Sequence, residues 1–130
     1  METGAAISVL LVEDNDVFRE ALELMLGGAP GLNVVGSVAD GEAAIGACVH
    51  LRPDVVLMDY RLPGLDGVEA TAAICASSDA AVVALTATAD PQELDALVDA
   101  GAVACLLKDA ELEHIVAAIR DAASDRASFV

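Results

Sequence analysis

Short apolar runs alternate along the chain with longer segments whose apolar residues recur at helical spacing. The apolar runs predict strands over 7–12, 32–38, 55–58, 80–85 and 103–107. The segments between and after them predict helices over 16–27, 40–50, 66–77, 90–101 and 110–122. A strand followed by a helix, five times over with short loops, predicts a parallel sheet covered by helices on both faces.

Residues with capping chemistry stand at the predicted helix boundaries. The carboxylates expected to cap the first turn of a helix are Asp40, Asp66, Asp90 and Asp109. Gly101 suits the position at which a helix ends. In the helix over 66–77 we expect Val68, Ile74 and Cys75 to face inward.

The composition indicates one cytoplasmic domain with an aliphatic core. The 130 residues suffice for one domain, and 56% are hydrophobic but only 2% aromatic. No apolar stretch approaches the roughly 20 residues of a membrane span, and no secretory signal is recognisable. Cys48, Cys75 and Cys105 form no CxxC pair, so we expect reduced thiols. His50 and His114 complete no zinc-binding spacing and are expected on helix surfaces.

The charge of the chain is strongly negative. Acidic residues number 22 and basic residues 6, which gives a net charge of −16. Such a surface repels the phosphates of nucleic acid, so this chain is a poor candidate for direct DNA binding. Most acidic residues are expected to keep the domain soluble, although the surplus could also attract divalent cations or a basic partner.

Polar residues stand at the ends of four of the five predicted strands. They are Glu13, Asp14, Asp59, Thr86 and Lys108. Because ligands of parallel α/β folds bind beyond the carboxyl ends of the strands, these side chains are expected at one site. Converging carboxylates repel one another unless a cation neutralises them, and oxygen ligands suit Mg²⁺. The set predicts phosphoryl transfer, with Asp59 as nucleophile and Lys108 and Thr86 holding the product.

The same residues carry a resemblance to a known family. The chain resembles a bacterial two-component response-regulator receiver domain over residues 7–122. The matching features, in chain order, are Glu13-Asp14, the acceptor Asp59, Pro63, Gly67, "LTA" around Thr86, and Lys108. The phrases "RPDVVLMD", "GEAA" and "LLKDA" most resemble the NarL/FixJ-type subgroup, which is usually fused to a LuxR-type helix-turn-helix domain.

The resemblance implies a fold and a set of site residues. The fold would be a flavodoxin-like (βα)5 sandwich whose five-stranded parallel sheet has the order 2-1-3-4-5. Asp14 and Asp59 would bind Mg²⁺ directly, together with the backbone carbonyl of Arg61, and Glu13 would act through a metal-bound water. Phosphorylation would draw Thr86 inward and reshape the face formed by the fourth helix, the fifth strand and the fifth helix.

The resemblance also implies partners and limits. A sensor histidine kinase or a small phosphodonor such as acetyl phosphate would supply the phosphoryl group. The domain would catalyse only its own phosphoryl transfer and autodephosphorylation. It could pair with a second copy through the fourth-helix face or through the first and fifth helices. DNA would be reached only through an effector domain absent from this chain, with residues 1–124 as receiver and 125–130 as a tail or the start of a linker.

Two alternatives to a phosphorylation switch remain open. The family usually carries Tyr or Phe where Cys105 stands, three residues before the lysine, so a degenerate receiver acting as a phosphorylation-independent interaction module is one alternative. A haloacid-dehalogenase-like phosphatase is the other, but it needs a second acid two residues after the nucleophile, where this chain has Arg61. In the family, the positions of Arg61 and Thr88 flank the acyl phosphate and influence its lifetime.

Overall fold

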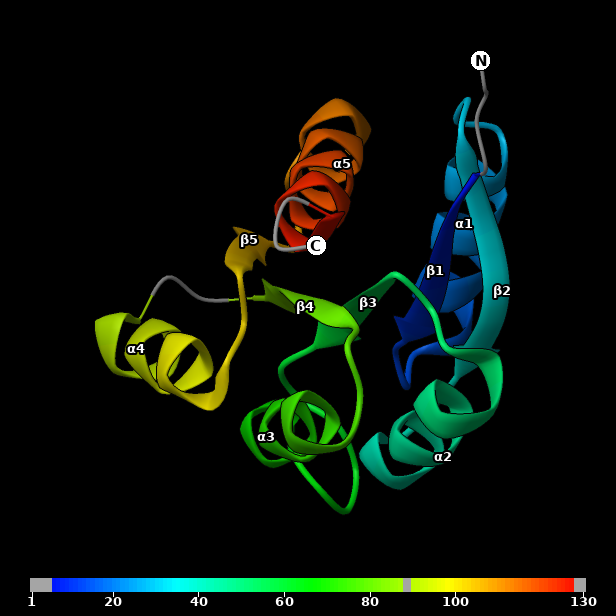
Figure 1. The fold of residues 1–130 in the computed structure, drawn as a ribbon. Coiled ribbons are helices and arrows are strands. Elements are labelled where there is room, and N and C mark those ends of the chain that lie inside the picture. Colours follow the sequence, from blue (N-terminus) through cyan, green and yellow to red (C-terminus); the bar gives the residue numbers. More distant parts are fainter. Residues whose placement is uncertain (1–5, 88–89, 128–130) are drawn as a thin grey trace.

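One parallel five-stranded sheet forms the centre of the molecule (Figure 1). The computed structural model describes residues 6–87 and 90–127. The strands are β1 (Ile7–Val12), β2 (Leu32–Val38), β3 (Val55–Asp59), β4 (Ala81–Thr86) and β5 (Ala104–Leu107). Their order in the sheet is β2-β1-β3-β4-β5, as predicted, so the strand order reverses direction at β1 and β3. In parallel sheets, ligands bind at such a switch point.

Five helices cover the two faces of this sheet. They are α1 (Asp16–Gly27), α2 (Gly41–Leu51), α3 (Gly67–Ser77), α4 (Pro91–Ala100) and α5 (Leu112–Ala127). Helices α1 and α5 cover one face, whereas α2, α3 and α4 lie along the other (Figure 1). None of the helices in the described residues is long and apolar enough to cross a membrane.

The central strands contribute side chains to two separate apolar cores, one on each face of the sheet. On β1, Val9 and Leu11 pack with the apolar side chains of α1 and α5, while Leu10 and Val12 pack with those of α2 and α3. Successive side chains of a strand point to opposite faces, so an uninterrupted apolar run serves both cores. Each fully buried aliphatic side chain stabilises the fold by about 1.5–3 kcal/mol.

Helix starts agree with the predicted caps in three places. Asp40, Asp66 and Asp90 each accept a hydrogen bond from a backbone N–H in the first turn of α2, α3 and α4, respectively. Asp66 also forms a capping box, because the Glu69 carboxylate accepts a hydrogen bond from the Asp66 N–H. Each such cap contributes about 1 kcal/mol.

The last helix differs from its prediction at both ends. It begins at Leu112, so Asp109 lies in a turn and is not its cap. A hydrogen bond from the Ala110 N–H to the Leu107 carbonyl closes that turn, and the Glu111 carbonyl is the first to accept from the helix. The helix then continues to Ala127, beyond the predicted end at 122, while the domain boundary at 124 stays a prediction.

The inward face of α3 also needs one correction. Ile74 is fully buried as predicted, and Val68 packs at the edge of a small cluster near α4, but Cys75 is exposed. The buried stripe of α3 runs through Gly67, Ala70, Thr71 and Ile74. Cys75 lies outside this stripe, with Sγ 3.7 Å from the Gly101 carbonyl oxygen.

Smaller shifts affect three strands, and the first of them is that β3 extends one residue beyond its prediction, to Asp59. Strand β4 runs from Ala81 to Thr86, one residue later than predicted at each end, and β5 begins at Ala104. The shift places Thr86 inside β4, in register with Leu107 of β5. His50 and His114 are exposed on α2 and α5, as predicted.

Candidate functional site

Three carboxylates meet at the carboxyl edge of the sheet. Glu13 directly follows β1 and Asp59 is the last residue of β3, and these two strands are neighbours. Glu13 is only 2% exposed and Asp59 only 3%, whereas Asp14 is exposed. Each of the three offers a carboxylate oxygen, and these oxygens lie within 4.8 Å of one another. The cluster therefore presents two buried acids and one that solvent reaches.

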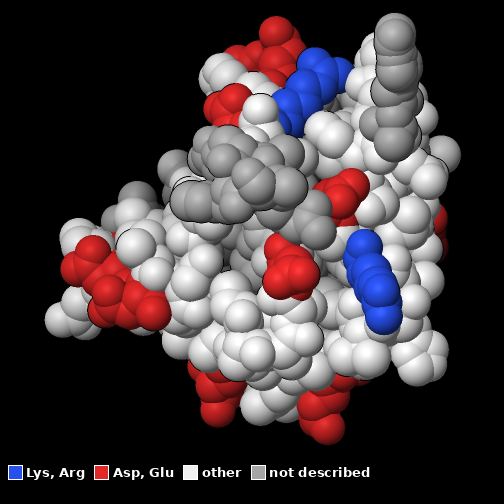
Figure 2. All heavy atoms as spheres, viewed as in Figure 1, with Lys and Arg blue, Asp and Glu red and all other residues white. Residues whose placement is uncertain are grey.

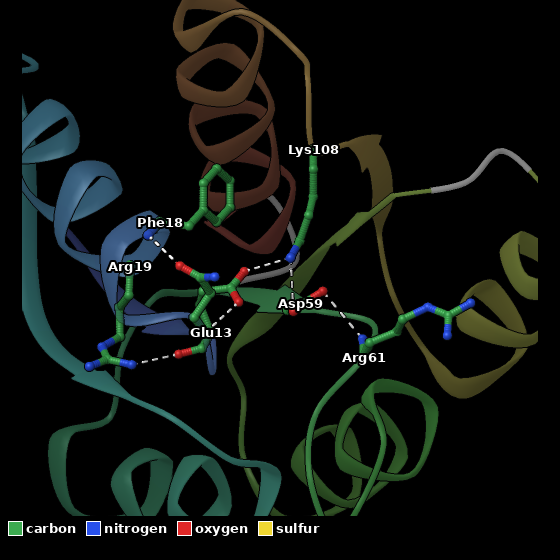
Figure 3. A network of polar contacts seen from close by, with 7 residues as sticks. Glu13, Phe18, Arg19, Asp59, Arg61 and Lys108 are labelled. Carbon is green, nitrogen blue, oxygen red and sulfur yellow. Dashed lines mark hydrogen bonds and ion pairs between the residues drawn. The ribbon is translucent and has the colours of Figure 1, made fainter.

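Lys108 partly neutralises the cluster (Figure 3). Its Nζ lies 2.8 Å from Glu13 Oε1 and 3.0 Å from Asp59 Oδ2. Burial alone would lower the pKa of Lys108, but the hydrogen bonds and negative charges of Glu13 and Asp59 outweigh it and raise that pKa above its usual value. One ammonium facing three carboxylates leaves excess negative charge, and all-oxygen donors of this kind suit a divalent cation such as Mg²⁺.

Strand β5 and helix α1 together place the Lys108 side chain. The Lys108 N–H donates to the Thr86 carbonyl oxygen at 2.8 Å, which fixes its backbone beside the end of β4. Its Nζ also lies 5.0 Å from the centroid of the Phe18 ring on α1. Sequence reasoning missed Phe18, because an apolar residue at helical spacing is typical of core packing.

Thr86 is the remaining one of the five polar residues predicted at the strand ends. It is 1% exposed and is the last residue of β4. Asp59 pairs in register with Leu85, so Thr86 is one residue beyond the partner of Asp59. All five residues predicted from the strand ends therefore stand along the β1, β3, β4 and β5 ends of one sheet edge.

The loop after Asp59 folds back on the acid. The Arg61 N–H donates to Asp59 Oδ1 at 3.2 Å, and the Gly67 N–H donates to the Tyr60 carbonyl at 2.8 Å. A Cβ on Gly67 would lie 2.6 Å from Tyr60 Cα and 2.8 Å from the Asp59 carbonyl oxygen, so only glycine fits there. Beside the loop is a hollow of about 470 Å³ lined by Asp14, Tyr60, Arg61, Leu62, Pro63 and Asp66.

The loop after β1 is held by Arg19 of α1. Arg19 Nη1 donates to the Glu13 carbonyl at 2.8 Å, and Nη2 donates to Asp16 Oδ1 at 2.7 Å. The Asn15 N–H donates to Glu13 Oε2 at 2.9 Å. These bonds fix the turn that presents Glu13 and Asp14. Sequence reasoning assigned Arg19 no role at this site.

Family membership agrees with this geometry. Residues 9–120 match the family described as "Response regulator receiver domain". The chain belongs to this family. Its receiver fold is also that of the solved receiver domain of the putative response regulator NarL from Mycobacterium tuberculosis, with a TM-score of 0.89 and 34% identity. That similarity covers 93% of this chain and 98% of the solved one.

Curated relatives of this receiver domain include transcriptional regulators. It is 38% identical over 117 residues to the transcriptional regulatory protein LiaR of Bacillus subtilis, covering 89% of this chain and 56% of LiaR. It is 35% identical over 121 residues to the probable transcriptional regulatory protein NarL of Mycobacterium tuberculosis, covering 92% of this chain and 56% of NarL. The chain thus spans about half the length of these relatives, and their similarity agrees with the predicted subgroup.

Cys105 lies in a small cluster between the sheet and α4. The buried members of this cluster are Ala84, Leu97 and Ala102, and the partly buried ones are Tyr60, Val68 and Cys105. Burial raises the pKa of the Cys105 thiol above its usual value, which disfavours the thiolate form. The receiver domain thus has an aromatic side chain in this region, but it is supplied by Tyr60. Thr88, the other residue predicted to flank the acyl phosphate, lies outside the described residues.

Proposed function

We propose that the receiver domain accepts a phosphoryl group on Asp59 and thereby switches a signalling output. The observation that carries this proposal is the convergence of Glu13, Asp14, Asp59 and Lys108 at one edge of the sheet. A nucleophilic carboxylate, a cation beside it and an acidic site for a metal are the parts that phosphoryl transfer needs.

The residues of the site divide the work of the transfer. A carboxylate oxygen of Asp59 attacks phosphorus and forms a P–O bond. The P–N bond of a kinase phosphohistidine, or the P–O bond of acetyl phosphate, breaks, and the leaving group takes the bonding electron pair. Lys108 exchanges its contact with the Asp59 carboxylate for a phosphoryl oxygen, and the Thr86 hydroxyl donates a hydrogen bond to that group.

The acidic cluster fits a single Mg²⁺. Asp14, Asp59 and the backbone carbonyl of Arg61 would bind the ion directly, and Glu13 would do so through a water. Mg²⁺ would offset the negative charge of the acids and the incoming phosphoryl group. The fit rests on two buried carboxylates that, within the described part of the chain, share one ammonium, that of Lys108, as a counter-charge.

Similarity to transcriptional regulators supports a proposal for the output of the switch. We place this domain in the cytoplasm with a sensor histidine kinase as its partner, and we assign the domain no activity beyond its own phosphoryl transfer and autodephosphorylation. The face formed by α4, β5 and α5 changes on phosphorylation and controls transcription through a DNA-binding domain outside this chain. That face, or α1 with α5, would also mediate homodimerisation.

Intact-mass measurement tests the central step. After incubation with acetyl phosphate and Mg²⁺, the wild-type domain should gain the mass of one phosphoryl group, and the gain should disappear without Mg²⁺. Asp59→Asn should take up none, while Asp54→Asn, which changes a carboxylate at the opposite end of β3, should behave like the wild type. An equal gain in Asp59→Asn, or none in the wild type, would contradict the proposal.

A further inference from the structure

Glu93 in the first turn of α4 is a carboxylate in an unusual setting. Its side chain is only 15% exposed, and its buried Oε2 has no hydrogen-bond partner among the residues that the structure describes. A buried carboxylate oxygen without a donor is costly, because it loses water and gains nothing in exchange. The helix cap does not explain this placement, since Asp90 supplies it. Glu93 is therefore held inward by its other contacts.

Those contacts come from the two residues that follow Asp59. Arg61 Nη2 lies 3.7 Å from Glu93 Oε1, and the Arg61 side chain is otherwise 74% exposed. The pKa of Tyr60 is raised above its usual value by burial, then by the negative charges of Glu93 and Asp66, and by a hydrogen bond to Glu93. Tyr60 also packs against the cluster of Ala84, Leu97 and Ala102, in which Leu97 belongs to α4. The Glu93 carboxylate on α4 thus interacts with both Tyr60 and Arg61, the first two residues of the loop between β3 and α3.

Arg61 contacts Asp59 through its backbone and Glu93 through its side chain. Its backbone N–H donates to Asp59 Oδ1, whereas its side chain extends away from Asp59 (Figure 3). The Arg61 guanidinium is a mobile charge on a long stem, attached beside the phosphoryl acceptor. A phosphoryl group on Asp59 adds negative charge and acceptor oxygens close to the start of that stem. It would then compete with Glu93 for one guanidinium.

We propose that Glu93 is a positioning residue that holds Arg61 away from Asp59 and couples the charge on Asp59 to α4. Without phosphorylation, Glu93 keeps the guanidinium on the α4 side. With phosphorylation, the guanidinium turns to the phosphoryl oxygens, and Glu93 is left as a buried carboxylate with one partner fewer. The first turn of α4 must then move to bring Glu93 to solvent. This inference rests on the proposed phosphorylation of Asp59.

The chain contains a built-in probe for the coupling. Tyr60 is its one tyrosine, and it has no tryptophan, so intrinsic fluorescence excited near the tyrosine band comes from Tyr60 alone. Beryllofluoride with Mg²⁺ can serve as a phosphoryl mimic, and its affinity can be measured by calorimetry while Tyr60 emission follows the loop. The two measurements separate anion binding from the response next to α4.

The decisive variants form a double-mutant cycle. Glu93→Gln keeps the shape of the side chain but removes its charge, which frees the Arg61 guanidinium. The affinity for beryllofluoride should therefore rise by about two- to fivefold, which corresponds to the usual strength of a partly exposed ion pair. In an Arg61→Gln background, which keeps the backbone carbonyl and N–H, Glu93→Gln should change affinity little. Asp95→Asn removes one charge from an exposed position of α4 and should leave the affinity near that of the wild type.

The outcomes distinguish this inference from the proposed function. If the wild type binds beryllofluoride but Glu93→Gln acts like Asp95→Asn, the coupling is overturned and the proposed function stands. The coupling also fails if Glu93→Gln raises affinity equally with and without Arg61, because a simple charge effect would do so. If the wild type binds no beryllofluoride, the proposed function falls and this inference falls with it.

Discussion

Lys108 is held by two buried carboxylates and by the face of an aromatic ring. In the proposed function both carboxylates change their bonding when a metal or a phosphoryl group arrives, but Phe18 does not. A cation over a ring face gains about 0.5–1 kcal/mol at exposed sites and about 2 kcal/mol when desolvated. In that mechanism the ring would keep the ammonium near Asp59 while Lys108 exchanges its other partners.

Substitution of Phe18 should affect the rate of phosphorylation. Phe18→Leu keeps an apolar side chain but removes the ring face, so phosphorylation by acetyl phosphate should slow by about two- to fivefold, the equivalent of about 0.5–1 kcal/mol. Phe18→Tyr keeps the ring and should react at nearly the wild-type rate. Time-resolved mass measurement gives both rates, and circular dichroism checks that the variants fold. Equal rates for the Leu and Tyr variants would show that the ring face has no role.

The loop between β3 and α3 is the element that depends most on a single backbone position. Gly67 begins α3, and a Cβ added there would collide with the backbone of Tyr60 and Asp59. Gly46 lies inside α2, and a Cβ added there would meet nothing within 4 Å. Two helical glycines in one molecule are thus under opposite constraints.

The matched alanine variants should shift stability in opposite directions. Gly67→Ala should lower the free energy of unfolding by about 1–3 kcal/mol through overpacking, and it should slow phosphorylation by displacing the acceptor loop. Gly46→Ala should raise that free energy by about 0.5–1 kcal/mol, because alanine is the better helix former. Urea unfolding measures both changes. A Gly67→Ala protein as stable and as reactive as the wild type would contradict the close approach.

Sequence reasoning succeeded where a local pattern decides the structure. Uninterrupted apolar runs gave the strands, and Asp40, Asp66 and Asp90 gave three helix starts, because cap geometry is local. The prediction was wrong at Asp109, which lies in a turn closed by the Ala110 N–H and does not cap α5. It was also wrong at Cys75, which lies outside the buried stripe of α3.

The same distinction applies to the site. Glu13, Asp14, Asp59, Thr86 and Lys108 could be predicted because strand order alone brings strand ends together. The contacts of Phe18 with Lys108 and of Glu93 with Arg61 could not, since both depend on distances between side chains from separate elements. No periodicity or spacing in the sequence encodes those distances.

The whole molecule carries a large negative charge that is spread over its surface. Acidic side chains appear at several places on the face in Figure 2, including a group over α4, and basic side chains are fewer. A net charge of −16 on 130 residues opposes the compact state through self-repulsion. Ions should therefore stabilise this domain in two ways, by general screening and by binding at the acid cluster.

Thermal or urea unfolding in different salts should separate the two effects. Sodium chloride should raise stability by screening in the wild type and in every variant. Mg²⁺ at ten times its dissociation constant should add about 1.4 kcal/mol beyond sodium chloride of equal ionic strength. Asp14→Asn should lose that extra gain, while Asp95→Asn should keep it. An equal effect of Mg²⁺ on both variants would mean that it acts only by screening.

The division of the core into an α1–α5 half and an α2–α3 half bears on how this domain can diverge in evolution. Neighbouring residues of one strand, such as Leu10 and Leu11, belong to different halves, so a change of volume at one is compensated by helices that the other does not contact. Substitutions in the α1–α5 half of the core can therefore accumulate independently of those in the α2–α3 half. A lineage could remodel the side that meets its partners while the opposite side, and the strand ends that carry the chemistry, stay as they were.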